Sequence, residues 1–227
     1  MRRLLSILVL ILAMAPASAS AQQSLNLYLG GFIPRSEDAR SRDDVLVNNL
    51  DFLAFNLRDF DAPTVGGEWL IGIGDKFEGG LGVGISSRTV PAVYLDYTNE
   101  NGFEIEQDLK LRIVPFSATV RFLPLGRRDS IEPYIGAGVG VFGFRYSESG
   151  QFLATDNTIF RDTFVGSGSA TGPVILGGVR VPIGVGAVGG EIRYQSAEGA
   201  LPKDEDFAGS RIDLGGISYL LTLKLRF

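Results

Sequence analysis

Apolar residues recur at every second position over most of the chain, which is the pattern of a β-strand with one apolar face. The last segment, SYLLTLKLRF, shows it most clearly, with apolar side chains at Tyr219, Leu221, Leu223, Leu225 and Phe227. The same alternation recurs in seven earlier segments: 24–34, 64–75, 79–87, 113–125, 132–146, 173–183 and 188–195. With a terminal strand over about 211–227, the pattern predicts eight strands.

The connections between these segments alternate in length. Short turns are expected after the second, fourth and sixth strands, at 75–78, 126–130 and 184–186. Long polar loops are expected after the first, third, fifth and seventh strands, at 35–63, 91–108, 148–170 and 198–210. Short turns on one side and long loops on the other are typical of an up-and-down outer-membrane barrel. An even number of strands would place both chain ends on the short-turn side.

The long segments are rich in acidic residues, and the first of them has an ambiguous local pattern. Segment 91–108 holds five acidic residues and no lysine or arginine. In segment 35–63 the leucines 46, 50, 53 and 57 recur at helical spacing, and Ser41 or Asp43 could cap a short helix there. The alternation in FLAFNL predicts instead that the second strand begins near Phe52, so both readings stay open.

The first 21 residues have the features of a cleaved secretory signal peptide. Arg2 and Arg3 precede an apolar run from Leu4 to Ala15, and the small residues Ala19-Ser20-Ala21 follow. We therefore expect a signal peptide at 1–21 and one barrel domain at 22–227. The alternative, a membrane anchor, is disfavoured because the apolar run is short for a membrane-spanning helix.

Charged residues occupy the face opposite the apolar stripe in the middle of several strands. A soluble barrel would turn its apolar face inward, whereas a membrane barrel turns it outward to lipid. Export, mid-strand charges and aromatic residues near the ends of the apolar stripe (Trp69, Tyr194, Tyr219, Phe227) favour the membrane barrel. A soluble periplasmic barrel of the lipocalin type is the alternative. The charges expected to form a network in the lumen are Glu68, Arg121, Arg180, Glu191, Arg193 and Lys224.

The lumen of a narrow eight-stranded barrel is packed with side chains, so buried charges there should pair. Arg180 and Glu191 lie on adjacent strands joined by a short turn, and they are expected to form an ion pair. Such a network would hold the barrel together; the alternative is a gate that plugs a narrow pore.

Two segments resemble a known family. PYIGAGVGVFGF (133–144) is similar to the fifth strand of small outer-membrane barrels of the opacity-protein and outer-membrane-protein-A or -W type, and SYLLTLKLRF resembles their carboxy-terminal assembly signal. The resemblance implies a closed, antiparallel, eight-stranded transmembrane β-barrel with long extracellular loops and short periplasmic turns. It also implies outer-membrane lipid, the barrel-assembly machinery and periplasmic chaperones as partners, and a monomer. Within this family the fold is shared but the activity is not.

Composition narrows the possible chemistry. The chain has no histidine, so a Ser-His-Asp triad and histidine metal sites are impossible, and it has no cysteine for a disulfide or a lipoprotein anchor. Removing Arg2 and Arg3 leaves 19 basic and 26 acidic residues, which disfavours nucleic-acid binding. GVGVFG (138–143) matches a dinucleotide-binding pattern but no helical pattern follows it, so its glycines are assigned to the barrel's inner face.

The sequence as a whole predicts an all-β, non-enzymatic outer-membrane protein without a cofactor. Its expected role is structural or in surface interactions through acidic extracellular loops. A narrow pore or conduit for small or hydrophobic solutes is the main alternative, and a soluble periplasmic binder is less favoured.

Overall fold

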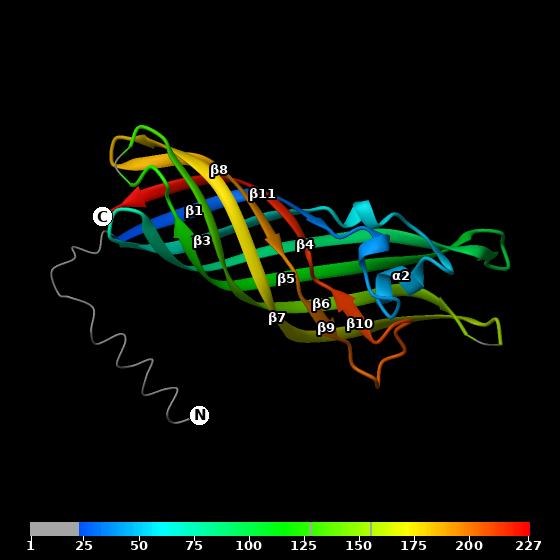
Figure 1. The fold of residues 1–227 in the computed structure, drawn as a ribbon. Coiled ribbons are helices and arrows are strands. Elements are labelled where there is room, and N and C mark those ends of the chain that lie inside the picture. The colour runs from blue at the N-terminus through cyan, green and yellow to red at the C-terminus, as the bar shows by residue number, and fades with distance from the viewer. Residues whose placement is uncertain (1–22, 128, 155) are drawn as a thin grey trace, which may run out of the picture.

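The computed structural model describes residues 23–227 except residues 128 and 155, and within them it shows an elongated, closed β-barrel (Figure 1). The predicted signal peptide at 1–21 lies outside the described residues. Eight long strands form the wall: β1 (Gln23–Pro34), β3 (Ala62–Ile73), β4 (Phe77–Thr98), β5 (Glu104–Phe122), β6 (Glu132–Leu153), β7 (Ile159–Ile183), β8 (Gly186–Gln195) and β11 (Gly216–Arg226).

Each wall strand pairs antiparallel with its neighbours in the chain, and β1 closes the ring by pairing with β11. In that closing pair Leu25 lies opposite Leu225, and Ile33 lies opposite Ile217. Closure leaves the wall without an unpaired sheet edge, as the interior of a bilayer requires. The predicted fold class, an eight-stranded up-and-down barrel, is confirmed. Among the described residues no helix is long and apolar enough to cross a membrane.

The short turns lie at one end of the barrel, here called the turn end, and the carboxy-terminus lies beside them (Figure 1). The backbone amide of Phe227 donates to the carbonyl of Gln23, so the two ends of the described chain are neighbours there. The opposite end, the loop end, carries the helix α2 (Val45–Asn49) and the small strands β9 (Glu198–Ala200) and β10 (Arg211–Asp213). The predicted position of the chain end beside the short turns is confirmed.

For two of the four segments predicted to be loops, the prediction is wrong. Segments 91–108 and 148–170 consist mostly of strand. In the first segment β4 continues to Thr98 and β5 begins at Glu104, and in the second β6 continues to Leu153 and β7 begins at Ile159. On β5 the extension is polar on the outside, as at Glu106, Asp108 and Lys110, which gives it the composition of a loop. The backbones of these extensions nevertheless stay paired, with Leu109 opposite Glu148 and Glu148 opposite Phe164.

The first loop contains a short helix, but not with the predicted cap. It runs through a 3-10 turn η1 (Glu37–Ala39), helix α2, the two-residue strand β2 (Leu53–Ala54) and a second 3-10 turn η2 (Leu57–Phe60). Asp44, rather than Ser41 or Asp43, caps α2 by accepting hydrogen bonds from the amides of Leu46 and Val47. The alternative in which a wall strand starts near Phe52 is wrong, since β3 begins at Ala62.

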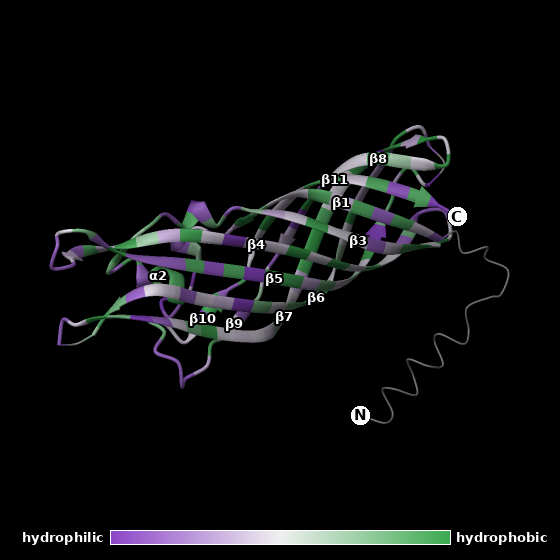
Figure 2. Cartoon of the chain, turned by 180° about the vertical axis from the view of Figure 1, so that it is seen from behind, coloured by the Kyte–Doolittle hydropathy of each residue, from purple (hydrophilic) through white to green (hydrophobic). Residues whose placement is uncertain are grey.

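The apolar side chains of the wall lie on its outer face in one half of the barrel and on its inner face in the other half. In the half near the turn end, apolar side chains point outward, such as Leu81 on β4, Phe116 on β5 and Val139 on β6, each more than half exposed. Beyond this belt the inward positions become apolar, and on β5 the outward positions become charged: Ile113 and Leu111 are buried while Arg112 is exposed. In Figure 2 green bands alternate along the strands with white or purple ones, and the purple bands are more frequent toward the loop end.

An outward apolar belt around a closed barrel matches the requirement of a lipid environment. The soluble lipocalin-like alternative required these apolar residues to point inward, and it is therefore wrong. Trp69, Tyr194, Tyr219 and Phe227, the expected aromatic residues of the interfaces, all lie on the exposed exterior.

Candidate functional site in the barrel lumen

The lumen near the turn end is filled by two groups of buried charges. The first group, here called the mid-barrel cluster, consists of Glu68, Arg121, Glu191 and Arg193. Arg121 contacts Glu68 at 2.6 Å and Glu191 at 3.0 Å, and Arg193 contacts the same two carboxylates at 3.0 and 2.5 Å. Two acids and two bases therefore neutralise each other. A dry lumen requires this, because an unpaired buried charge costs several kcal/mol, about 3–5 when one partner of a pair is removed.

The fold makes room for this cluster with residues that lack bulky side chains. Gly82 faces Glu68 across the β3–β4 pair, and a Cβ at this position would lie 2.6 Å from the Cγ of Glu68. Asn26, directly opposite Glu68 on β1, donates from its amide to Glu68 Oε2 at 3.2 Å. The glycine-rich inner face therefore accommodates long charged side chains inside a narrow barrel.

The second group, here called the turn-end cluster, consists of Glu78, Glu132, Arg180 and Lys224. Arg180 contacts Glu78 at 2.8 Å and Glu132 at 3.7 Å, and Lys224 pairs with Glu78. Arg226, which is partly exposed, reaches Glu132 at 2.6 Å from the rim. All four members of the cluster are buried, so it seals the barrel just inside the short turns.

Tyr134 lies between the two clusters and links them. Its hydroxyl donates to Glu191 Oε2 at 3.0 Å. The guanidinium carbons of Arg180 and Arg121 lie 4.5 and 5.3 Å from its ring centroid, within the range of cation–π attraction. The charges and the ring therefore form one continuous layered filling.

All six charges proposed from the sequence point into the lumen, but they are not paired as expected. The predicted Arg180–Glu191 pair is wrong, since Arg180 contacts Glu78 and Glu132 while Glu191 contacts Arg121 and Arg193. In the β7–β8 register Glu191 lies opposite Gly178 rather than Arg180. The two side chains therefore diverge toward different layers of the lumen.

Sequence reasoning missed four members of the filling: Glu78, Glu132, Tyr134 and Asn26. Glu78 was assigned to a turn and Glu132 to a strand end. In the alternation of inward and outward side chains along β4 and β6, however, each lies at an inward position. An earlier start for β4, at Phe77, would have placed Glu78 on the same face as Gly80 and Gly82.

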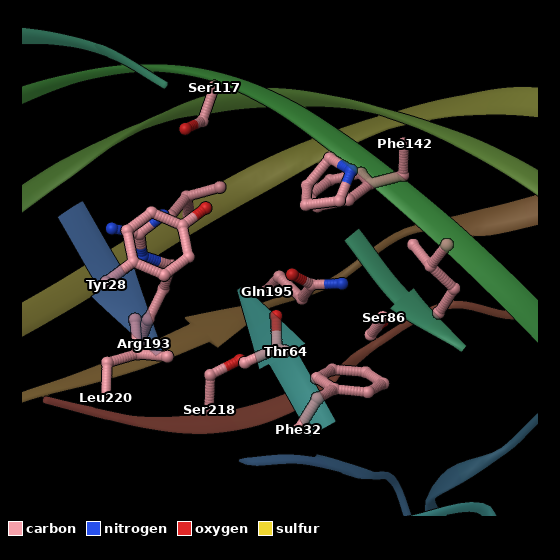
Figure 3. Close-up of a pocket in the computed structure, with 13 residues that line it drawn as sticks. Tyr28, Phe32, Thr64, Ser86, Ser117, Phe142, Arg193, Gln195, Ser218 and Leu220 are labelled. Atoms are coloured by element: carbon pink, nitrogen blue, oxygen red, sulfur yellow. The ribbon is translucent and has the colours of Figure 1, made fainter. Parts of the chain in front are cut away.

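A small enclosed cavity lies between the mid-barrel cluster and the apolar half of the lumen (Figure 3). Tyr28, Arg193 and Gln195 line its polar side, and Phe142 and Phe32 line its apolar side. Its volume is about 20 Å³, which is enough for about one water molecule. A space of this size is too small to hold a continuous column of water.

Above this cavity the lumen becomes a hydrophobic core. The first loop enters the loop end of the barrel and packs Leu46, Leu53 and Phe60 against the inward faces of the strand extensions. Leu109, Phe144 and Ile212 belong to the same cluster. The loop end is therefore filled as the interior of a soluble protein is filled, by apolar side chains.

Asp44 fixes the first loop to the last one. Its carboxylate accepts from the amide of Asp213 at 2.6 Å and pairs with Arg40 at 3.0 Å, with both side chains fully buried. Burial raises the pKa of Asp44 above its usual range, and the neighbouring Arg40 opposes that shift. Around it, Ser41 donates to Glu198 at 2.5 Å and Ser210 bonds Asp43. The contacts of Asp43 and Glu198 with the opposite loop are here called the loop latch.

The predicted assembly signal lies on the closing strand. Tyr219, Leu221, Leu223, Leu225 and Phe227 all point outward and are exposed, while Leu220, Thr222 and Lys224 point inward and are buried. The stripe is therefore available to lipid or to a protein partner.

No family model and no curated protein matches the sequence. Solved structures do match. Outer membrane protein OprG from Pseudomonas aeruginosa is similar at 13% identity and a TM-score of 0.51, covering 91% of this chain and 96% of that one. Neisserial surface protein A matches at 11% identity and a TM-score of 0.49, covering 92% of this chain and 98% of that one. The expected resemblance to small outer-membrane barrels is confirmed for the fold, which together with the apolar belt supports an outer-membrane location.

Proposed function

We propose that this protein is a non-conducting outer-membrane barrel that holds a rigid extension at the cell surface for contact with other molecules. The observation that carries the proposal is the filled lumen. Two neutral charge clusters occupy the turn end, an apolar core occupies the loop end, and the cavity between them has a volume of about 20 Å³.

A pore would need a continuous wet path, and this filling opposes one at two levels. Ions would have to displace Arg121 and Arg180 from their carboxylates, which leaves charges unpaired in a narrow lumen. They would also have to pass the apolar contacts made by Leu46 and Phe60. The lumen network therefore supports a structural role better than a gating role.

The extension beyond the belt supports a role in surface contacts. β4 to β7 project past the belt as paired strands, which gives the surface a fixed shape rather than a set of mobile loops. Acidic residues face outward along β5 at Glu104, Glu106 and Asp108. This charged, ordered wall is suited to binding a partner. The lack of histidine in the sequence supports a non-catalytic protein.

Single-channel recording in a planar bilayer tests the proposal. Refolded protein, shown to be folded by a heat-modifiable shift on a gel, should give no stable conductance steps, while an open porin recorded in the same bilayers does. A variant lacking residues 45–60 should also stay silent, because the charge clusters remain beneath the removed loop. Reproducible steps from the intact protein would contradict the proposal, and steps from the deletion variant alone would indicate a loop-gated pore.

A further inference from the structure

Two arginines face each other on the outer wall just beyond the apolar belt. Arg112 on β5 and Arg145 on β6 are directly opposite partners in the strand register, and both are exposed. Side chains in such a pair have Cβ atoms about 4.5–5.5 Å apart, and like charges placed there destabilise a sheet. An anion bound between the two side chains would offset this repulsion.

Within the described chain no carboxylate supplies this compensation. Neither arginine, nor Lys110 beside them, takes part in an ion pair or donates a side-chain hydrogen bond. Along β5 the nearest outward acidic residue is Asp108, whose Cα atom lies about 13 Å from that of Arg112 by strand rise. By contrast Arg35, also at the loop end, contacts Asp213 at 3.1 Å.

The neighbouring outward positions are small and carry hydroxyl groups. Ser87 lies opposite Arg112 on β4, and Ser167 lies opposite Arg145 on β7. These residues flank the arginine pair across four adjacent strands and leave both guanidinium groups accessible. Hydroxyl groups next to paired guanidinium groups suit an oxyanion with several acceptor oxygens.

The position of this patch identifies the kind of anion. The next outward residues toward the belt are Val114 and Gly143, followed by the exposed apolar Phe116 and Val141. One side of the patch thus contacts the acyl-chain region and the other faces water, which is the depth of a lipid headgroup. A guanidinium pair binds phosphate in a bidentate manner.

We propose that Arg112 and Arg145, assisted by Lys110, bind the headgroup phosphate of an anionic lipid in the leaflet at the loop end. The site uses the outer wall, so it is independent of whether the lumen conducts, although it rests on the barrel lying in a membrane. Lipid bound there relieves the repulsion between the arginines and ties the strand extensions to the membrane surface.

The test measures binding of diphosphoryl lipid A to protein refolded in a neutral maltoside detergent, by native mass spectrometry. The variant R112S/R145S should bind lipid A about a hundredfold more weakly, because each lost charge-assisted hydrogen bond weakens binding by about tenfold or more and two arginines are removed. The control variant R58S/R161S removes the same charge from exposed positions away from the belt, and its affinity should stay within about twofold. Equal weakening in both variants, or none in either, would overturn the proposal.

Two further measurements separate the possible causes. Inorganic phosphate at the same concentration as lipid A should not displace it; displacement would indicate a site for free anions and overturn the lipid assignment. In neutral detergent without lipid, R112S/R145S should unfold at the same or a higher temperature than the parent, because a repulsive pair has been removed. A lower unfolding temperature there would show that the two arginines stabilise the sheet themselves and would also overturn the proposal.

Discussion

Arg121 is the single residue that joins the most elements of the lumen. It extends from β5 to contact Glu68 on β3 and Glu191 on β8, and its guanidinium lies near the ring of Tyr134 on β6. Its side chain and both partner carboxylates are completely buried. Because the contacts of Arg121 lie on three other strands, this position should be the most sensitive of the cluster's four members.

Replacing Arg121 by methionine should therefore destabilise the barrel strongly. The change keeps most of the volume but leaves two buried carboxylates facing one remaining base, Arg193, and we expect a loss of about 3–5 kcal/mol. Urea unfolding in detergent micelles, followed by the gel shift, measures it. The matched control R211M breaks a pair with Glu198 in which the arginine is 56% exposed, so it should change stability by about 0–1 kcal/mol.

A second substitution distinguishes charge balance from packing. In R121M/E68Q the cluster keeps one acid and one base, Glu191 and Arg193, so part of the lost stability should return. If the double variant is as unstable as the sum of its parts, the loss comes from packing or from hydrogen bonds, and the neutrality argument is wrong.

Single residues also show where sequence reasoning reaches its limit. Parity alone indicated that Glu68, Arg121 and Glu191 share the inward face, because a strand's side chains alternate without exception while the backbone stays regular. Which charges contact each other depends on strand stagger and tilt around the ring. These are set by all eight pairings together, so the Arg180–Glu191 expectation failed while the face assignment for both residues agrees with the structure.

At the scale of elements, the strand extensions explain the wrong loop predictions. On β5 the apolar positions are even-numbered from Phe116 to Phe122 and odd-numbered from Ile105 to Ile113. On β6 the same change occurs between Val141 and Phe142. The period of two persists through both strands, and only its phase reverses, because the apolar side must face lipid in one half and the protein's own core in the other. A reversal of phase therefore marks the belt's edge.

The latch between the first and last loops should respond to acid. The hydrogen bond from Ser41 and the neighbouring Arg211 hold the pKa of Glu198 below its usual range, and Ser210 does the same for Asp43. A carboxyl whose folded pKa is depressed stabilises the folded state above its unfolded pKa and loses that contribution as pH falls through the folded value. We therefore expect the latch to loosen below about pH 4, the ordinary range of these groups.

Hydrogen exchange of the β9 and β10 amides, corrected for the intrinsic effect of pH on exchange, measures this loosening. The parent should lose protection between pH 6 and the acid range, whereas E198Q should be less protected at pH 6 and change less on acidification. D204N, at an exposed carboxylate in the same loop, should behave as the parent does. Unchanged protection of the parent in acid would mean that Asp44 and the apolar core hold the loops without the latch.

At the scale of the whole molecule, one continuous wall of eight strands encloses two different kinds of interior, one after the other along the barrel. The half inside the apolar belt is held by paired charges and the half beyond it by hydrophobic packing, and the cavity of about 20 Å³ lies where they meet. The eight-strand count, the placement of the chain end and the inward charges could all be predicted from the sequence. The filling of the loop end could not, because it depends on the first loop folding back into the mouth, a non-local contact that alternation does not encode.

Closure of the ring depends on the last strand, which also carries the outward-facing carboxy-terminal stripe. β11 pairs with β1 over eleven residues and with β8 over ten, so the barrel cannot close until it is in place. Yet Tyr219 and Phe227 point outward and are 51% and 75% exposed, and each contributes to stability only by its lipid contact, at most about 1.5–3 kcal/mol. Such residues are free to be bound by a partner before closure.

We predict that Y219S/F227S impairs assembly in cells far more than refolding in detergent. Outer-membrane fractionation with heat-modifiable gel mobility reports the first, and the refolded fraction of purified protein reports the second. The control L81S/V139S removes two exposed apolar side chains from β4 and β6, so it loses comparable lipid contact without touching the end of the chain. The control should lower both readouts by similar factors, whereas the terminal variant should lose the folded form mainly in cells. Equal losses in the two assays for the terminal variant would mean that the stripe serves stability in lipid alone and is not recognised by an assembly partner.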